Sequence, residues 1–333
     1  MKVGYVSFLW LVLIMECKAV ELGDQFATTT RQPVPFGKPI SDYNDFSWTP
    51  GVLSELAELS RIAYVPKLDR SREIKPSWQL LLHGVRFLHV RRKDNSGRDV
   101  HVFAFRGTAT TFQETYTDTP INDYTDVANL AQSHSYGSYE GIEALLGFIW
   151  AFRNDLNHVA TYISDFLDHC LTSNSSVIFT GHSLGGAMAN IAGALSAKKG
   201  KQNQASIVTF GAPSVFSPTT AQWMRTVFPS SSNVRIINKY DLIPDSPEFF
   251  PALPNLFLLN LFGFCFTLPN TEHVGVTKMV TSPPSIDDGV GWTAMISHNM
   301  EHNYITPLEQ EENVTFVAKL ATLLFLRKLY WTS

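Results

Sequence analysis

The pentapeptide Gly181-His182-Ser183-Leu184-Gly185 is the feature of this sequence that most constrains its fold. A β-branched and aromatic run precedes it, and small apolar residues that favour a helix follow from Ala187 to Ala197. A strand, a tight turn and a helix in this order form a nucleophile elbow, which holds a serine in a strained backbone conformation. The two glycines are expected because a side chain there would collide with the neighbouring strand or helix. The pattern therefore predicts Ser183 as a catalytic nucleophile. The alternative is a glycine-rich connection with no catalytic purpose.

Strand and helix patterns alternate on both sides of this turn, which predicts a largely parallel α/β sheet. The expected strands cover residues 80–91, 99–105, 177–180, 206–210 and 234–237, and the expected helices cover residues 51–64, 143–170 and 187–197. The first two strands are expected to form a hairpin around residues 93–97. The 333 residues contain no internal repeat. Residues 20–333 are therefore predicted to form a single domain.

The first 19 residues have the features of a secretory signal peptide. Lys2 precedes an apolar stretch from Val3 to Met15, and the small residues Cys17 and Ala19 occupy the −3 and −1 positions of a cleavage site. The stretch is too short to span a bilayer comfortably. We expect cleavage after Ala19, no transmembrane segment afterwards, and a location outside the cell or in the lumen of the secretory or lysosomal pathway. An uncleaved anchor is the alternative.

Charge and cysteine content narrow the choice of partners. The formal net charge of −4 gives no basic footprint, so nucleic acid is not expected as a partner. In an oxidising compartment, Cys170 and Cys265 can pair only if the fold brings them within disulfide range. Asn174 and Asn313 begin glycosylation sequons, which fit a secreted surface.

A nucleophilic serine needs a base, a group that orients the base, and donors for the oxyanion. In this architecture the acid and the histidine follow the serine along the chain. Asp241 is the predicted acid because it follows the strand over 234–237, and open α/β sheets place their sites at the carboxyl ends of strands. Asp245, Asp287 and Asp288 are the alternatives.

The base must come from the three histidines of the last part of the chain. His273 opens an expected strand and is predicted to make only a local hydrogen bond. His298 is the predicted base, and His302 is the alternative.

Residues 298–302 also match His-x-x-Glu-His, a zinc peptidase arrangement with two metal ligands one helical turn apart. This alternative needs a third ligand, for which only Glu309, Glu311 and Glu312 follow nearby, and it leaves Ser183 without a purpose. We therefore expect no metal and no cofactor.

Two backbone positions are candidates for the oxyanion hole. The N–H of Leu184 lies at the expected start of the elbow helix. A second donor is expected at the end of the strand over 99–105, where Gly107 lets the backbone approach and Thr108 offers an N–H and a hydroxyl. Each such donor contributes about 3–4 kcal/mol of transition-state stabilisation. A strand end capped by threonine is the alternative.

These motifs together resemble the class 3 lipases, the fungal-type triacylglycerol lipase family of the α/β-hydrolase superfamily. They occur in family order over roughly residues 85–305 and comprise Phe105-Arg106-Gly107-Thr108, residues 181–187, Thr209-Phe210-Gly211-Ala212-Pro213, Asn238-x-x-Asp241-x-Ile243-Pro244, His273-Val274-Gly275 and a late histidine followed by tyrosine. The resemblance implies an α/β-hydrolase fold with a mostly parallel central sheet flanked by helices, and a lid over residues 109–140. It also implies ester hydrolysis with Ser183 as nucleophile, Asp241 orienting the base His298, and Thr108 with Leu184 forming the oxyanion hole.

The sequence departs from the family pattern in three places. Many members follow the Gly-x-Pro of their strand with Arg-Val-Gly-Asn, whereas this chain has Ala212-Pro213-Ser214-Val215-Phe216. The histidine-to-tyrosine spacing is six residues from His298 and two from His302, against the family's three to five. The lid candidate contains no tryptophan and few aliphatic residues. A polar lid favours shorter or more polar esters such as mono- or diglycerides, phospholipid acyl chains or aryl esters.

The expected function is therefore a monomeric triacylglycerol or acylglycerol lipase that works through an acyl-enzyme at a lipid–water interface. The alternatives are a phospholipase A1-type or feruloyl-type esterase and, in another class, a lipase homologue that binds lipid without catalysis. All the positions expected to be catalytic carry competent residues, which argues against the last of these.

Overall fold

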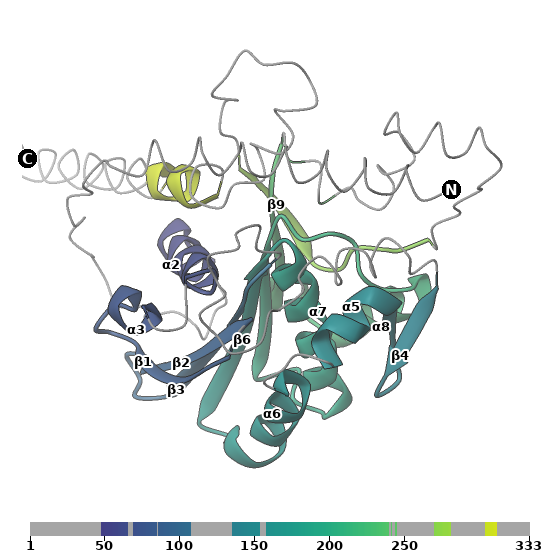
Figure 1. Ribbon diagram of the computed structural model, residues 1–333, viewed down its shortest axis with the longest axis horizontal. Helices are drawn as coiled ribbons and strands as arrows, with labels where there is room; N and C mark the ends of the chain where they lie inside the picture. Colours follow the sequence, from purple (N-terminus) through teal and green to yellow (C-terminus); the bar gives the residue numbers. More distant parts are fainter. Residues whose placement is uncertain are drawn as a thin grey trace, which may run out of the picture.

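The computed structural model describes residues 48–65, 69–84, 86–107, 135–153, 158–239, 241, 244, 270–280 and 304–311. Within these residues the centre is a seven-stranded sheet with the order β1-β2-β3-β6-β7-β8-β9. Helices lie on both sides of this sheet (Figure 1). The strands from β3 to β9 are parallel, whereas β1 and β2 join one edge in antiparallel pairings. This arrangement confirms the expected mostly parallel α/β sheet.

The strands of this sheet are β1 (Gln79–His83), β2 (Phe87–Lys93), β3 (Asp99–Phe105), β6 (Ser175–His182), β7 (Ala205–Phe210), β8 (Asn233–Asn238) and β9 (Val276–Val280). A separate ribbon pairs β4 (Tyr136–Tyr139) with β5 (Ile142–Leu145). The helices are α2 (Pro50–Ile62), α3 (Arg70–Glu73), α5 (Leu146–Arg153), α6 (Val159–Asp165), α7 (Leu184–Lys198) and α8 (Pro218–Val227), with a π-helical turn at Phe166–Cys170 and a 3-10 turn at Ser230–Ser232. Residues 304–311 are also helical.

Helices cover both faces of the sheet, so the central strands are buried on both sides. Successive residues of β3 pack on opposite faces of the sheet: Val102 packs on the side of α2, whereas Phe103 packs on the side of α5, α6 and α7. Every residue of β7 is buried. This two-sided burial explains why these strands read as continuous apolar runs in the sequence. Because β3, β6, β7 and β8 run parallel, their carboxyl ends lie together along one side of the sheet.

The structure corrects two of the expected elements. The strand expected over 80–91 is two strands, β1 and β2, because the chain reverses at Gly84, whose N–H donates to the carbonyl of Phe87 at 2.9 Å. The long helix expected over 143–170 is instead β5, α5, α6 and the π-helical turn. The first residues of this segment form a strand and not a helix, because the N–H of Leu145 donates to the carbonyl of Val215, outside the segment, at 3.0 Å. The end of the lid candidate forms β4, and residues 109–134 lie outside the described residues.

A buried pair of histidines ties the sheet to α6. His89 Nε2 lies 2.9 Å from His101 Nδ1, and His89 Nδ1 lies 2.9 Å from the hydroxyl of Tyr162. The His89 ring also stacks on Phe103 with centroids 4.0 Å apart. Burial lowers the pKa of His89 well below its usual value and the pKa of His101 to about 4, and Arg91 contributes to both. Both imidazoles are therefore neutral in the folded protein at neutral pH.

We expect the protein to lose stability as the pH falls below about 6.5, the ordinary pKa of histidine. The unfolded chain then binds protons that the folded chain excludes, so each histidine lowers the free energy of unfolding by up to about 1.4 kcal/mol per pH unit. For His101 this loss continues until the pH reaches its folded pKa of about 4. Urea unfolding measured between about pH 7.5 and pH 5 reports the slope.

The matched variants for this measurement are His101→Asn and His169→Asn. An asparagine at position 101 keeps a nitrogen near the place of Nδ1 and no longer titrates, so the slope should become shallower. His169 is exposed in the π-helical turn, so its replacement controls for the loss of a surface histidine. Equal slopes in wild type and His101→Asn would contradict this explanation.

Candidate active site

Ser183 occupies the turn between β6 and α7, where the sequence predicts a nucleophile elbow. It is the N-cap of α7, with φ 58° and ψ −130°. A positive φ is unfavourable for a residue with a side chain, so this conformation stores strain. The N–H of Ser183 donates to the carbonyl of Phe210 at 3.0 Å, which ties the turn to the end of β7. The predicted strand, turn and helix are therefore present, with the serine half-buried at the carboxyl edge of the sheet.

Close packing of backbone against backbone requires the two glycines of the pentapeptide. A Cβ atom on Gly181 would lie 2.4 Å from the carbonyl carbon of Gly185. A Cβ atom on Gly185 would lie 2.2 Å from the carbonyl oxygen of Phe105, at the end of β3. Both distances are far below van der Waals contact. The glycines therefore let α7 begin directly against β3 and β6, as the sequence analysis expected.

The end of β3 lies against the elbow, where the second oxyanion donor is expected. A Cβ atom on Gly107 would lie 2.9 Å from Ser183 Cβ and 2.7 Å from the carbonyl oxygen of His182. Leu184 is the first residue of α7, and the first N–H groups of a helix have no partner within the helix. These two backbone segments thus meet beside the serine. Thr108 itself lies outside the described residues.

Asp241 follows β8 and is almost completely buried, with 4% of its surface exposed. Its N–H donates to the carbonyl of Asn238 at 3.0 Å, and its Oδ2 accepts a hydrogen bond from the hydroxyl of Tyr304. Tyr304 is fully buried, and burial together with the Asp241 carboxylate raises the pKa of its hydroxyl well above the usual value. Tyr304 is therefore a permanent donor that fixes the orientation of this carboxylate.

Aromatic rings connect the elbow with Asp241. The ring of Tyr304 packs edge-on against His182, with centroids 5.7 Å apart, and against Phe210, with centroids 6.2 Å apart. His182 Nδ1 lies 2.9 Å from the hydroxyl of Tyr64, which follows α2. Sequence reasoning assigned no role to Tyr64 or Tyr304. The only sequence signal for Tyr304 is that the family pattern has a tyrosine after the late histidine. Tyr64 has no such signal.

The structure brings Ser183, Leu184 and Asp241 to the same edge of the sheet, because β6 and β8 run parallel on either side of β7. His273 makes a hydrogen bond from Nε2 to the carbonyl of Pro244 at 2.5 Å, to a residue 29 positions away and not to the local partner predicted for it. Several other candidates lie outside the described residues: His298, His302, Asp245, Asp287, Asp288, the glutamate Glu312 and the zinc-type pattern over 298–302.

The cysteines, the glycosylation sequons and the signal peptide are described by the structure only in part. Cys170 is exposed and forms no disulfide within the part of the chain that the structure describes, whereas Cys265 lies outside it. Asn174 is exposed in the turn before β6, and Asn313 lies outside the described residues, as does the expected signal peptide over residues 1–19. None of the described helices is long and apolar enough to cross a membrane.

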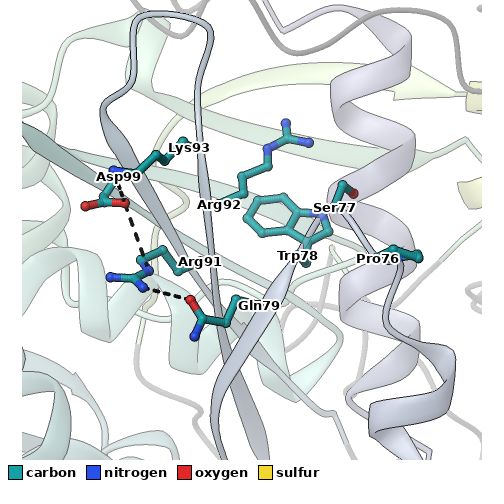
Figure 2. A pocket seen from close by; sticks show the side chains of 8 residues that line it. All are labelled: Pro76, Ser77, Trp78, Gln79, Arg91, Arg92, Lys93 and Asp99. Atoms are coloured by element: carbon teal, nitrogen blue, oxygen red, sulfur yellow. Dashed lines mark hydrogen bonds and ion pairs between the residues drawn. The ribbon is translucent and has the colours of Figure 1, made fainter.

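A pocket of about 400 Å³ lies at the opposite end of the sheet, near the start of β3 (Figure 2). It is lined by Pro76, Ser77, Trp78, Gln79, Arg91, Arg92, Lys93 and Asp99. Its cations are paired within the protein: Arg91 and Lys93 lie 4.0 Å and 3.3 Å from Asp99, and Arg92 lies 3.0 Å from Glu55. This internal pairing fits a structural role at the sheet edge better than a catalytic site.

The strand order, the strained serine between β6 and α7 and the buried aspartate after β8 are those of the α/β-hydrolase fold. The resemblance to one family within this class is confirmed, because residues 102–250 match the model of the family described as lipase (class 3). This match begins in β3 and includes both Ser183 and Asp241. No curated protein sequence matches the chain.

Several solved lipase structures are similar to this chain. The lipase from Rhizopus microsporus var. chinensis is 20% identical with a TM-score of 0.46, over 78% of this chain and 85% of that one. Lip2 lipase from Yarrowia lipolytica is 16% identical with a TM-score of 0.44, over 77% of this chain and 92% of that one. The native propeptide complex of Rhizomucor miehei lipase is 19% identical with a TM-score of 0.43, over 69% and 68%.

Proposed function

We propose that this protein is a secreted serine ester hydrolase that cleaves the acyl esters of lipids, as a triacylglycerol or acylglycerol lipase. The strained backbone of Ser183 carries this proposal, because a serine at φ 58° is retained only where the surrounding structure enforces it. The match of residues 102–250 to class 3 lipases supports the same chemistry. The signal-like first 19 residues support secretion or delivery to a lumen.

The proposed reaction proceeds through an acyl-enzyme. Ser183 Oγ attacks the ester carbonyl while His298 takes its proton, and the Leu184 N–H and Thr108 bind the oxyanion that forms. The tetrahedral intermediate collapses, the acyl–oxygen bond to the alcohol breaks, and His298 delivers its proton to the leaving alcohol. Asp241 holds the imidazole tautomer and stabilises the imidazolium. Water then attacks the acyl-enzyme by the same route in reverse and releases the fatty acid, without a cofactor.

The described residues supply the electrostatics for two of these steps. The oxyanion forms at the start of α7, where the helix dipole and its first N–H groups favour negative charge. The hydroxyl of Tyr304 holds one oxygen of Asp241, which fixes the plane in which the carboxylate meets the base. Because Tyr304 does not titrate near neutral pH, this orientation persists across the working range.

The base is the part of the proposed triad with an alternative close by. Tyr304 anchors the chain at Asp241, two residues after His302 and six after His298. An extended chain spans at most about 3.6 Å per residue, so both histidines are within reach of Asp241. We expect His298→Ala to lower kcat for a p-nitrophenyl ester by about 10⁴-fold or more, and His302→Ala to retain most of the activity. Thermal unfolding of both variants controls for folding. The reverse result would assign the base to His302.

A substrate panel tests the proposed function. It comprises triolein, phosphatidylcholine, monogalactosyl diglyceride, methyl ferulate and short-chain esters, each assayed with wild type and with Ser183→Ala. Turnover that is highest on acylglycerols supports a lipase, with the polar segment over 109–140 favouring mono- and diglycerides. Preference for phosphatidylcholine or methyl ferulate would instead indicate a phospholipase A1-type or feruloyl-type esterase. No serine-dependent turnover on any substrate would indicate a lipid-binding homologue, and loss of activity with a chelator would favour the zinc arrangement at residues 298–302.

The proposed enzyme acts as a monomer at a lipid–water interface. The ratio of activity on triolein emulsion to activity on a soluble short-chain ester measures its dependence on that interface. A lid with few apolar side chains gains little by opening onto lipid, so we expect a low ratio.

A further inference from the structure

One hydrogen bond links the loop that carries Asp241 to the segment before β9. His273 Nε2 lies 2.5 Å from the carbonyl oxygen of Pro244, three residues after Asp241. A carbonyl can only accept, so the imidazole donates its Nε2–H. The loop thus receives a side-chain donor from a segment that is 29 residues away along the chain.

The backbone of His273 is itself held from both sides. Arg225 of α8 donates from Nη2 to the carbonyl of His273 at 2.8 Å and to the carboxylate of Glu272 at 2.7 Å. Two residues further, Gly275 has φ 92°, and a Cβ atom there would lie 2.8 Å from the carbonyl oxygen of Asn233. The segment is therefore wedged between α8 and the start of β8. The imidazole projects from a fixed support toward Pro244.

The imidazole is neutral under assay conditions. Burial and the nearby Arg235 of β8 lower the pKa of His273 to about 4. The other charged groups that face this segment are Arg225 of α8 and Glu272, which pair with each other. A neutral imidazole has a single N–H, and the bond to Pro244 places that proton on Nε2. Replacing His273 with a neutral amide therefore changes hydrogen bonding and not charge.

We propose that His273 is a positioning residue for Asp241, which it holds in place through the carbonyl of Pro244. This inference rests on the proposed function, in which Asp241 orients the base. Tyr304 fixes the carboxylate of Asp241 and His273 fixes the loop that follows it, so the acid is restrained from two sides. Loss of the His273 bond lets the carboxylate move away from the imidazolium that it stabilises. The reaction slows, and the pKa of the base falls because its negative partner is more distant.

The test compares His273→Gln with His273→Asn. The amide nitrogen of glutamine reaches the place of Nε2 and retains the bond to Pro244, whereas that of asparagine stops near Nδ1. We expect His273→Gln to keep kcat/KM for a p-nitrophenyl ester within about twofold of wild type, and His273→Asn to lower it about tenfold. The acidic limb of the pH profile of kcat/KM should also move to lower pH by about half a unit in His273→Asn alone. A purely structural role would lower the melting temperature without moving this limb.

Ser183→Ala is assayed alongside to separate the two proposals. Wild-type activity in Ser183→Ala would overturn the proposed function and this inference together. This inference alone would be overturned if Ser183→Ala is inactive while His273→Asn keeps the wild-type kcat/KM and an unmoved acidic limb. Equal losses of kcat/KM in His273→Gln and His273→Asn would also overturn it. Should His273→Asn not fold, long-range ¹H–¹⁵N NMR of the wild type decides, with the His273 signal assigned by its absence in His273→Gln. A proton on Nε2 supports the inference, and a proton on Nδ1 overturns it.

Discussion

Ser183→Ala is expected to lower kcat for ester hydrolysis by at least about 10⁴-fold while the protein stays folded. The substitution removes one oxygen and keeps the Cβ atom, so the strained turn at φ 58° is retained. The half-buried hydroxyl is not needed to cap α7, because its side chain makes no capping hydrogen bond. The loss should therefore appear in turnover of a p-nitrophenyl ester and not in the melting temperature.

A second serine provides the matched control. Ser217 is the N-cap of α8, and its hydroxyl accepts a hydrogen bond from the N–H of Thr220 at 3.3 Å. Ser217→Ala should lower the free energy of unfolding by about 1 kcal/mol and leave kcat unchanged. Equal activity of wild type and Ser183→Ala, or equal inactivity of both, would contradict the assignment of Ser183 as nucleophile.

Gly185→Ala is expected to destabilise the protein by about 3 kcal/mol or more. Its new methyl group would lie 2.2 Å from the carbonyl oxygen of Phe105 and 2.8 Å from the carbonyl carbon of Arg106. Both contacts are backbone atoms of the chain at the end of β3, which cannot rotate away as a side chain can. Relief requires α7 to move off the sheet, and this movement also displaces the Leu184 N–H. Urea unfolding measures the loss of stability, and activity should fall with it.

Gly200→Ala, just beyond the end of α7, separates a steric clash from backbone strain. Gly200 has φ 70°, and a Cβ atom there would meet nothing within 4 Å. Its replacement should cost only about 1–2 kcal/mol, the strain of an alanine in the left-handed region. A Gly185→Ala variant that is no less stable than Gly200→Ala would show that α7 can shift without penalty.

The sequence predicted best what depends on local backbone chemistry. The turn at Ser183, the glycine Gly181 and the flanking strand and helix follow from sterics within a few residues, and the structure contains all of them. Gly185 differs, because the atom that excludes a side chain there belongs to Phe105 of β3. Asp241 was located by its place after a strand, which is a property of every open α/β sheet. The position of each was therefore predictable without knowledge of its neighbours.

The larger of the two errors in the expected elements lies where distant segments decide the outcome. The apolar stripe over 143–170 has helical periodicity, but the bridge between Ala144 and Phe216 draws its first residues into a strand. The helix is interrupted further along, since His158 adopts φ 52° before α6. Tyr64 carries no motif in the sequence, and its partner His182 is 118 residues away along the chain. Hydrophobic periodicity indicates which side chains of a segment can be buried, but it does not indicate which other segment they pack against.

The parallel pairing of β3 with β6 determines when in folding Ser183 acquires its strained backbone conformation. The two strands are adjacent in the sheet but separated in the chain by β4, β5, α5 and α6. Such non-local pairs form late in folding, because the entropy of closing the loop must be met before the contact is gained. The contact between Gly185 and Phe105 depends on this pairing. Ser183 therefore reaches its strained conformation only when the two halves of the sheet have joined. A chain that has not yet paired β3 with β6 lacks the strained turn on which the proposed reaction depends.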